Sequence, residues 1–163
     1  MEAAAVKDLA AVRQEAQELL DAYVECLDDD RVEEWPDFFN DNATYKVIAR
    51  ENVERNLPIA TMSCTSRGMI QDRAVAIRKA SVFSPRYLRH IVSSVRIVGE
   101  ENGAFLLHAN FAVFQTMQDE DTKVFMVGKY RARMVLTAGG PKFQELLAIY
   151  DSSQIPGLLA IPI

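Results

Sequence analysis

Histidine and cysteine are scarce in this sequence, with two residues of each among 163. His90 and His108, like Cys26 and Cys64, are widely separated, and no HxH, HxxxH or CxxC spacing occurs. A metal site needs several nitrogen, sulfur or carboxylate ligands that converge on one point. The sequence therefore predicts no metal and no redox cofactor on this chain. Each histidine is interpreted as a hydrogen-bonded wall or interface residue rather than a ligand or a base.

Long apolar runs and an excess of positive charge are also absent. No run approaches the about 20 apolar residues that span a bilayer, and residues 1–13 alternate alanine with charged residues instead of forming a signal-peptide core. The net charge of −5 argues against nucleic acid or an anionic membrane surface as a partner. We expect a cytoplasmic protein whose two cysteines are reduced.

Phosphate-binding and nucleophile motifs are missing as well. Gly139 and Gly140 precede Pro141 between two expected strands, which suits a hairpin and not a helix-opening anion site. No serine or cysteine lies in a nucleophile-elbow motif. The composition, with 49% apolar and 25% charged residues, is that of an ordinary globular protein, and we expect one domain over residues 1–163.

The first half of the chain is mainly helical in its pattern. Apolar residues between Leu9 and Leu27 recur every three or four positions, which predicts an amphipathic helix over residues 5–27. The pattern further predicts a short helix over 31–40 that holds Trp35, Phe38 and Phe39, a strand over 43–49, an irregular stretch over 50–58, and a helix over 67–81 with Met69, Ile70, Ala74 and Ile77 on one side.

The period changes to two after residue 87. Four runs of alternating apolar residues are separated by turn-rich breaks at 99–103, 118–122 and 138–141, which predicts an antiparallel meander. Helices followed by a long sheet give an α+β fold. Because several strands are unusually long and long strands twist, we expect a strongly curved sheet around the helices with a conical interior.

Two features predict a surface for a partner. In the third run, Val124, Met126, Gly128, Tyr130, Ala132, Met134 and Leu136 occupy one face, and Lys129, Arg131 and Arg133 form a basic stripe on the other. This stripe is either a solvated face or a surface that receives acidic residues of a partner. Phe143, Leu147 and Ile149 are expected to share the apolar face in the fourth run. Residues 155–163 are uncharged and apolar, so they either fold back onto the domain or contact a neighbouring subunit, and we favour the neighbour. The predicted interface residues are Lys129, Arg131, Arg133, Ile155, Pro156, Leu158, Leu159, Ile161 and Ile163.

Six segments, taken in order, carry a resemblance to a known family: EWPDFF (34–39), TYKV (44–47), RENVER (50–55), GMIQDR (68–73), YLRH (87–90) and YDSS (150–153). Together they resemble the small (β) subunit of bacterial Rieske-type aromatic-ring-hydroxylating dioxygenases across nearly the whole chain. The resemblance implies a nuclear-transport-factor-like (cystatin-like) cone. It also implies an oligomer of three large and three small subunits, with the Rieske iron-sulfur cluster and the mononuclear iron on the large (α) catalytic subunit. The small subunit is then structural, and no catalytic residue is carried over.

The number of possible ligands agrees with this implication. A Rieske centre takes two cysteines and two histidines, and a facial-triad iron takes two further histidines and a carboxylate. Two cysteines and two histidines cannot supply both centres. The 34–39 and 50–55 segments look closer to the family branch that acts on aromatic carboxylates than to the hydrocarbon branch, although the substrate itself is not readable from this chain.

Two alternatives share the expected fold: a free-standing isomerase or dehydratase, and a small-ligand-binding protein. The enzyme would use an inward-facing acid or base, and the candidates considered are Asp41, Tyr45, Asp72, Tyr130 and Tyr150. Both alternatives need an open pocket. Its lining would include Trp35, Phe38, Tyr45, Asp72, His90 and His108. A cone filled by Trp35, Phe38, Phe39 and Met69 would instead contradict the enzyme.

Overall fold

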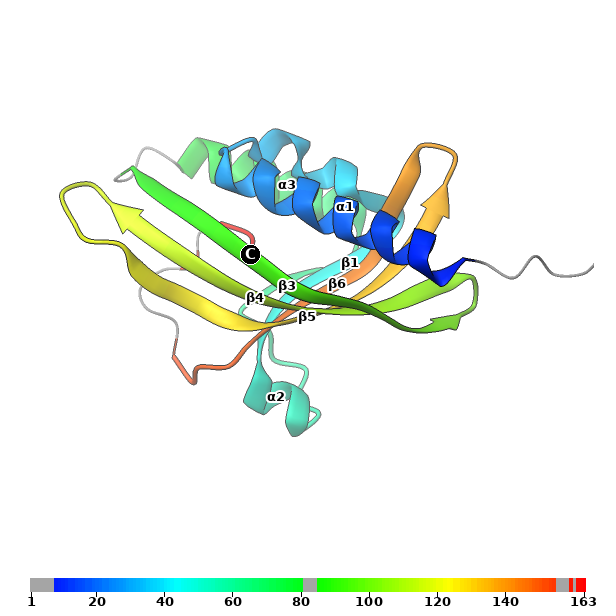
Figure 1. The fold of residues 1–163 in the computed structure, drawn as a ribbon. Coiled ribbons are helices and arrows are strands. Elements are labelled where there is room, and N and C mark those ends of the chain that lie inside the picture. Colours follow the sequence, from blue (N-terminus) through cyan, green and yellow to red (C-terminus); the bar gives the residue numbers. More distant parts are fainter. Residues whose placement is uncertain (1–7, 81–84, 155–158, 160) are drawn as a thin grey trace, which may run out of the picture.

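The computed structural model describes residues 8–80, 85–154, 159 and 161–163, and within them one curved six-stranded sheet carries helices on its concave side (Figure 1). The helices are α1 (Leu9–Asp28), the 3₁₀ helix η1 (Val32–Phe38), α2 (Arg50–Glu54) and α3 (Arg67–Ala80). The strands are β1 (Phe39–Ala49), β2 (Met62–Cys64), β3 (Arg86–Glu101), β4 (Ala104–Met117), β5 (Lys123–Thr137) and β6 (Gly140–Tyr150). The expected α+β cone is confirmed.

The strand order is β2-β1-β6-β5-β4-β3. The meander from β3 to β6 is antiparallel, as expected, but β1 pairs with β6 in parallel, so the sheet is mixed. In Figure 1, α1 and α3 both lie on the concave side of the sheet, while α2 projects from the opposite side. Within the described part of the chain, no helix has the length and apolar character that crossing a bilayer requires.

The bounds of several helices and strands differ from expectation, because helix caps and strand pairing determine where an element begins and ends. Helix α1 begins at Leu9 because the Asp8 side chain caps it, accepting a hydrogen bond from the Ala10 amide at 3.0 Å. The expected start at residues 5–7 lies outside the described residues. The predicted helix over 31–40 is a 3₁₀ helix that ends at Phe38, and residues 50–54 form α2 where an irregular stretch was expected. Strand β2, only three residues long, was not predicted because it is defined by its pairing with β1.

A bulge changes which residues of β6 face the core. The register between β5 and β6 shifts at Arg133 and Met134, so Phe143 is followed on the inner face by Leu146 and not by Glu145. The prediction that Leu147 and Ile149 share the inner face with Phe143 is therefore wrong. These two residues lie on the outer side, paired with Arg131 and Lys129. Val124 and Leu136, expected on the inner face of β5, are exposed near its ends.

Gly128 allows the close approach of β5 and β6. A Cβ atom at this position would lie 1.9 Å from the Ile149 carbonyl oxygen and 2.8 Å from the Tyr150 Cα. Only a residue without a side chain fits there, because backbone atoms cannot move away as a flexible side chain can. The backbones of β5 and β6 therefore approach each other closely at Gly128, two residues before the buried Tyr130.

The core is an aromatic cluster between α1, η1 and the sheet. Tyr23 of α1 is fully buried and makes edge-to-face contacts with rings from four positions, namely Phe38, Phe39, Tyr130 and Phe143. Such contacts stabilise the packing beyond simple burial of apolar area. On α3, Ile70 and Ala74 face this core, but Met69 does not: it is 44% exposed, and its sulfur accepts a hydrogen bond from the Thr65 hydroxyl.

Candidate functional site

The inside of the cone is occupied by the end of the chain. Ile163 is fully buried, and its carbonyl oxygen accepts hydrogen bonds from the Tyr23 hydroxyl at 2.8 Å and the Tyr45 hydroxyl at 3.1 Å. The Ile163 amide donates to the Tyr45 hydroxyl oxygen at 2.8 Å. Burial raises the pKa of both tyrosines above their ordinary value, so both phenols stay protonated and able to donate. This is the most specific polar arrangement inside the cone.

The aromatic residues expected to line a pocket fill the interior instead. Trp35 and Tyr45 are fully buried, with ring centroids 5.1 Å apart in an edge-to-face arrangement, and Phe39 packs beside both. Phe38 is half-buried against the core cluster. Of the four residues whose packing would contradict an open enzyme pocket, Trp35, Phe38 and Phe39 therefore pack as anticipated, and Met69 lies outside.

His90 points into the cone but is bound to Asp28. Its Nδ1 atom lies 2.6 Å from Asp28 Oδ1, and its backbone amide donates to Asp28 Oδ2 at 2.9 Å. Both side chains are nearly inaccessible, with 0% of His90 and 5% of Asp28 exposed. The other ring nitrogen, Nε2, is buried and has no hydrogen-bond partner among the residues that the structure describes. The pair joins the last residue of α1 to β3, and it is too deeply buried to meet a substrate.

His108 and Asp72 do not join this interior. His108 pairs with Arg96 and Arg131 across neighbouring strands and lies on the outer side of the sheet, opposite to His90. Asp72 is exposed on α3. Since the two histidines point to opposite faces, they cannot share one metal ion. Among the residues the structure describes, no cluster of three histidine, cysteine, aspartate or glutamate side chains is placed to bind one.

Of the other acid–base candidates, Asp41 is exposed in β1. The Tyr150 ring is buried in the core, and its hydroxyl forms a hydrogen bond with the Thr61 hydroxyl at 2.7 Å. Tyr130 is fully buried against Phe111, and burial raises the pKa of its phenol well above the ordinary value. In the described part of the chain, its hydroxyl has no hydrogen-bond partner. These residues are thus spread over the molecule and do not converge on one reaction centre.

A basic surface covers the outer side of the sheet, and we call Arg96, His108, Lys129, Arg131 and Arg133 the basic outer face. Lys129 and Arg131 are exposed and, within the described residues, have no carboxylate partner, whereas Arg133 Nη1 binds Glu101 Oε2 at 2.6 Å. Partial burial, and next the charge of Arg131, lower the pKa of His108. Exposed Ile91 and Val127 border the surface.

The apolar tail is only partly described. Ile155, Pro156 and Leu158, predicted as interface residues, lie outside the described residues. Leu159 and Ile161 are half-buried and pack against the chain's own core, and Pro162 and Ile163 are buried. The end of the tail therefore folds back onto the domain, which was the less favoured of the two explanations drawn from the sequence.

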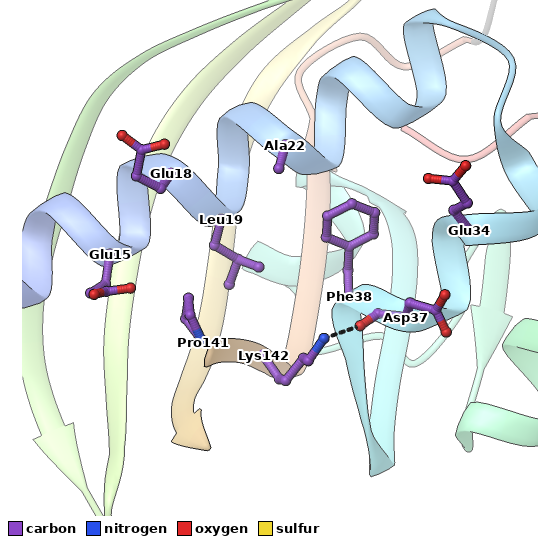
Figure 2. Close-up of a pocket in the computed structure, with 9 residues that line it drawn as sticks. All are labelled: Glu15, Glu18, Leu19, Ala22, Glu34, Asp37, Phe38, Pro141 and Lys142. Carbon is purple, nitrogen blue, oxygen red and sulfur yellow. Dashed lines mark hydrogen bonds between the residues drawn. The ribbon is translucent and has the colours of Figure 1, made fainter. Parts of the chain in front are cut away.

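A groove of about 310 Å³ lies between α1, η1 and the β5–β6 turn (Figure 2). Leu19 and Phe38 form its apolar part, and Glu15, Glu18, Glu34 and Asp37 surround it. Lys142 reaches across to donate to the Asp37 backbone carbonyl at 2.5 Å. Acidic side chains around the rim, without a converging base or ligand among the described residues, give a surface groove and not a reaction centre.

The main residues that the sequence did not single out are Asp28 and Tyr23, which hold His90 and Ile163. Both lie far from their partners along the chain, by 62 and 140 positions. Tyr23 was assigned to the apolar stripe of its helix, and Asp28 to a turn. Only a buried polar group on an otherwise apolar face, as with Tyr23, could have signalled such a role.

Comparison with known proteins supplies the family context. The family model described as "Ring hydroxylating beta subunit" matches residues 22–156. The chain is 34% identical over 145 residues to the small subunit of anthranilate 1,2-dioxygenase from Burkholderia cepacia, covering 89% of this chain and 90% of that one. It is 29% identical over 142 residues to the β 1 subunit of the terminal oxygenase component of terephthalate 1,2-dioxygenase from a Comamonas species, covering 87% and 92%.

A solved structure agrees with these relatives. The crystal structure of a chain from Novosphingobium aromaticivorans, provisionally assigned as the β subunit of an aromatic-ring-hydroxylating dioxygenase, superposes with a TM-score of 0.86. The two chains are 41% identical, and the match covers 96% of this chain and 100% of the other. The agreement extends over the sheet, the helices and nearly the whole length of the chain.

Proposed function

The chain belongs to the family of ring hydroxylating β subunits, and on this premise we propose that it supports the large subunit of an aromatic-ring-hydroxylating dioxygenase without taking part in the chemistry. It is the small subunit of such an oxygenase, which is an oxidoreductase. The proposed oligomer contains three large and three small subunits in the cytoplasm. In it the Rieske cluster and the mononuclear iron are held by the large subunit alone.

The observation that carries a non-catalytic role is the filled interior. Tyr23, Trp35 and Tyr45 are completely buried, and Ile163 occupies the space between the two phenols. An isomerase or dehydratase of this fold needs an acid or base that a substrate can reach. The one histidine that points inward, His90, is fully occupied at Nδ1 by Asp28 and is inaccessible. The same filling argues against an open small-ligand pocket in this state of the chain.

The supporting role requires a surface for neighbouring subunits, and the basic outer face is our candidate. Lys129 and Arg131 present positive charge that no carboxylate among the described residues pairs with, on a chain whose net charge is −5. Exposed Ile91 and Val127 add apolar area beside them. A surface that combines charge with apolar area suits an acidic neighbouring subunit, because charge complementarity steers docking and apolar burial stabilises it. Within this proposal, Ile155, Pro156 and Leu158 extend the contact, whereas Leu159 and Ile161 pack against the chain's own core.

The substrate class proposed for the complete oxygenase is an aromatic carboxylate. Anthranilate and terephthalate, the substrates named for two relatives, are both benzene carboxylates. The resemblance of the segments at 34–39 and 50–55 to the family branch that acts on aromatic carboxylates points to the same class. Turnover of anthranilate, terephthalate and naphthalene by the assembled oxygenase checks this. Reaction with naphthalene only would contradict the proposed class.

The non-catalytic role is tested by the assembled oxygenase carrying His90→Gln or Tyr45→Phe in this chain. General acid–base catalysis contributes about 10²- to 10⁴-fold to a rate, so a catalytic side chain would reveal itself clearly. We expect kcat within about twofold of the unchanged complex once subunit content is matched. A loss of about 100-fold with intact assembly would contradict the supporting role and favour a reaction inside the cone.

A further inference from the structure

The end of the chain behaves like a bound ligand inside the cone. After β6 ends at Tyr150, the chain returns to the interior, where Ile163 is fully buried. Its carbonyl oxygen is held by two phenol hydroxyls, and its amide is held by one of them. These bonds join positions 118 and 140 residues apart, so they do not follow from local chain geometry.

The residues around Ile163 have the composition of a small-molecule site. Such sites are mostly apolar and aromatic, with a few polar groups that fix the ligand's orientation. Here the walls include Trp35 and Phe39, and the polar groups are the Tyr23 and Tyr45 hydroxyls. The buried indole N–H of Trp35 lies in the same cluster and adds a further donor. All these N–H and O–H groups can donate, which matches a ligand that carries acceptor oxygens.

We propose that the cone is a latent binding site for a small apolar molecule carrying a carboxylate or carbonyl oxygen, and that Ile163 is its intramolecular plug. We call the space around Ile163, between Tyr23, Tyr45, Trp35 and Phe39, the cage. An empty cage would leave the Tyr23 and Tyr45 hydroxyls buried and unpaired, which is unfavourable. A molecule that replaces Ile163 must therefore supply an acceptor as well as apolar surface. Benzoate has about as many non-hydrogen atoms as an isoleucine residue and combines both features. The site is separate from the supporting role proposed above, because it involves no partner subunit.

The chain contains its own reporter for this site. Trp35 is the only tryptophan and packs directly against Tyr45. Its fluorescence is expected to change when the neighbouring space gains or loses an occupant. The probe is benzoate, added to the full chain and to a shortened chain that ends at Pro162. We expect a saturable fluorescence change in the shortened chain, with an affinity at least about tenfold higher than in the full chain.

Two further substitutions in the shortened chain show whether the cage itself binds. Tyr45→Phe removes one donor and is expected to weaken benzoate binding by about tenfold, the typical effect of a lost hydrogen bond to a charged group. Tyr150→Phe is the matched control. Its hydroxyl bonds to Thr61 at 2.7 Å instead of to Ile163, and its loss is expected to leave the affinity unchanged.

The outcomes separate the parts of the inference. Equal benzoate binding by full and shortened chains would overturn the plug, and a folded shortened chain that binds no benzoate would overturn the site.

If the shortened chain does not fold, the variant Ile163→Gly in the full chain replaces it. This change keeps the backbone bonds to Tyr23 and Tyr45 and empties the space of the side chain. Toluene is then the probe, because apolar cavities of this kind take up aromatic hydrocarbons. Binding supports the cage, and a Trp35 signal that toluene does not change overturns it. None of these readouts depends on subunit assembly, so their failure leaves the supporting role intact.

Discussion

Asp28 and His90 form a buried pair that fastens the end of α1 to β3. The Asp28 carboxyl group accepts from the His90 amide with one oxygen at 2.9 Å and lies 2.6 Å from the ring Nδ1 with the other. An acid beside a histidine is also the arrangement that proton-transfer enzymes use. Here both oxygens are engaged and the His90 side chain is inaccessible, so the pair is a structural one.

Removing this pair is expected to destabilise the fold. Asp28→Ala leaves the His90 amide and ring N–H buried without a partner, and the expected loss in the free energy of unfolding is about 2–3 kcal/mol. Asp28→Asn keeps one acceptor oxygen, so the expected decrease in the free energy of unfolding is smaller. The control is Asp29→Ala at the exposed neighbouring position, with an expected change within about 0.5 kcal/mol. Urea unfolding measures all three, and equal effects at Asp28 and Asp29 would refute the structural role.

Gly128→Ala is expected to be more harmful than a glycine substitution elsewhere in the sheet. Its Cβ atom would meet the backbone of Ile149 at 1.9 Å, and overpacking of a core costs typically about 1–3 kcal/mol and occasionally more. The control is Gly99→Ala in β3, whose Cβ would lie 3.5 Å from a Leu106 methyl group, an ordinary contact. Thermal unfolding of the two variants gives the comparison, and a similar melting temperature for both would show that β5 and β6 can separate there.

Charge reversal on the basic outer face is expected to weaken the oligomer. The double change Lys129→Glu and Arg131→Glu places negative charge where an acidic neighbour is proposed, and the expected loss of subunit affinity is at least about tenfold. Lys123→Glu is the control on the same strand, because its ion pair with Glu120 is exposed and contributes little. Light scattering of the purified oligomer measures the effect. Unchanged mass for the double variant at low protein concentration would exclude this face.

His108 gives a pH dependence with a defined sign. Its pKa is lowered in the folded chain by partial burial, and further by Arg131, Lys129 and Arg96, so the unfolded chain binds this proton more readily. The isolated chain should therefore lose stability as the pH falls below about 6.5, the ordinary value for histidine. His108→Gln should flatten that part of the profile measured by urea unfolding. A steeper profile for the variant would contradict the assigned direction.

An acidic neighbour over the same face would reverse this effect on assembly. Negative charge beside His108 favours its protonated form, so the complex would take up a proton and the subunit affinity would rise as the pH falls. Measuring oligomer dissociation at several pH values, with the His108→Gln oligomer as the control, distinguishes the two directions. The opposite result would be a subunit affinity that decreases as the pH is lowered, seen with the unsubstituted chain but not with His108→Gln. That result would argue for a basic or apolar neighbour.

The sequence predicted the fold because its patterns are local. The change from a helical period to a period of two places the helices before the sheet, and the clean alternation around Lys129 and Arg131 assigns them to one face. The alternation fails in β6, because a bulge at Arg133 and Met134 is fixed by pairing between strands and not by composition. The same reason explains why the bonds of Asp28 with His90 and of Tyr45 with Ile163 were not foreseen: each joins distant parts of the chain.

The most direct test of the supporting role is purification of the tagged chain from its native host. We predict a stoichiometric complex with a larger, brown, iron-containing chain that retains oxygenase activity on an aromatic carboxylate. The small chain separated from it should be colourless and inactive. A colourless chain recovered alone, which by itself converts a substrate in a manner abolished by His90→Gln, would contradict the account and assign the activity to the cone.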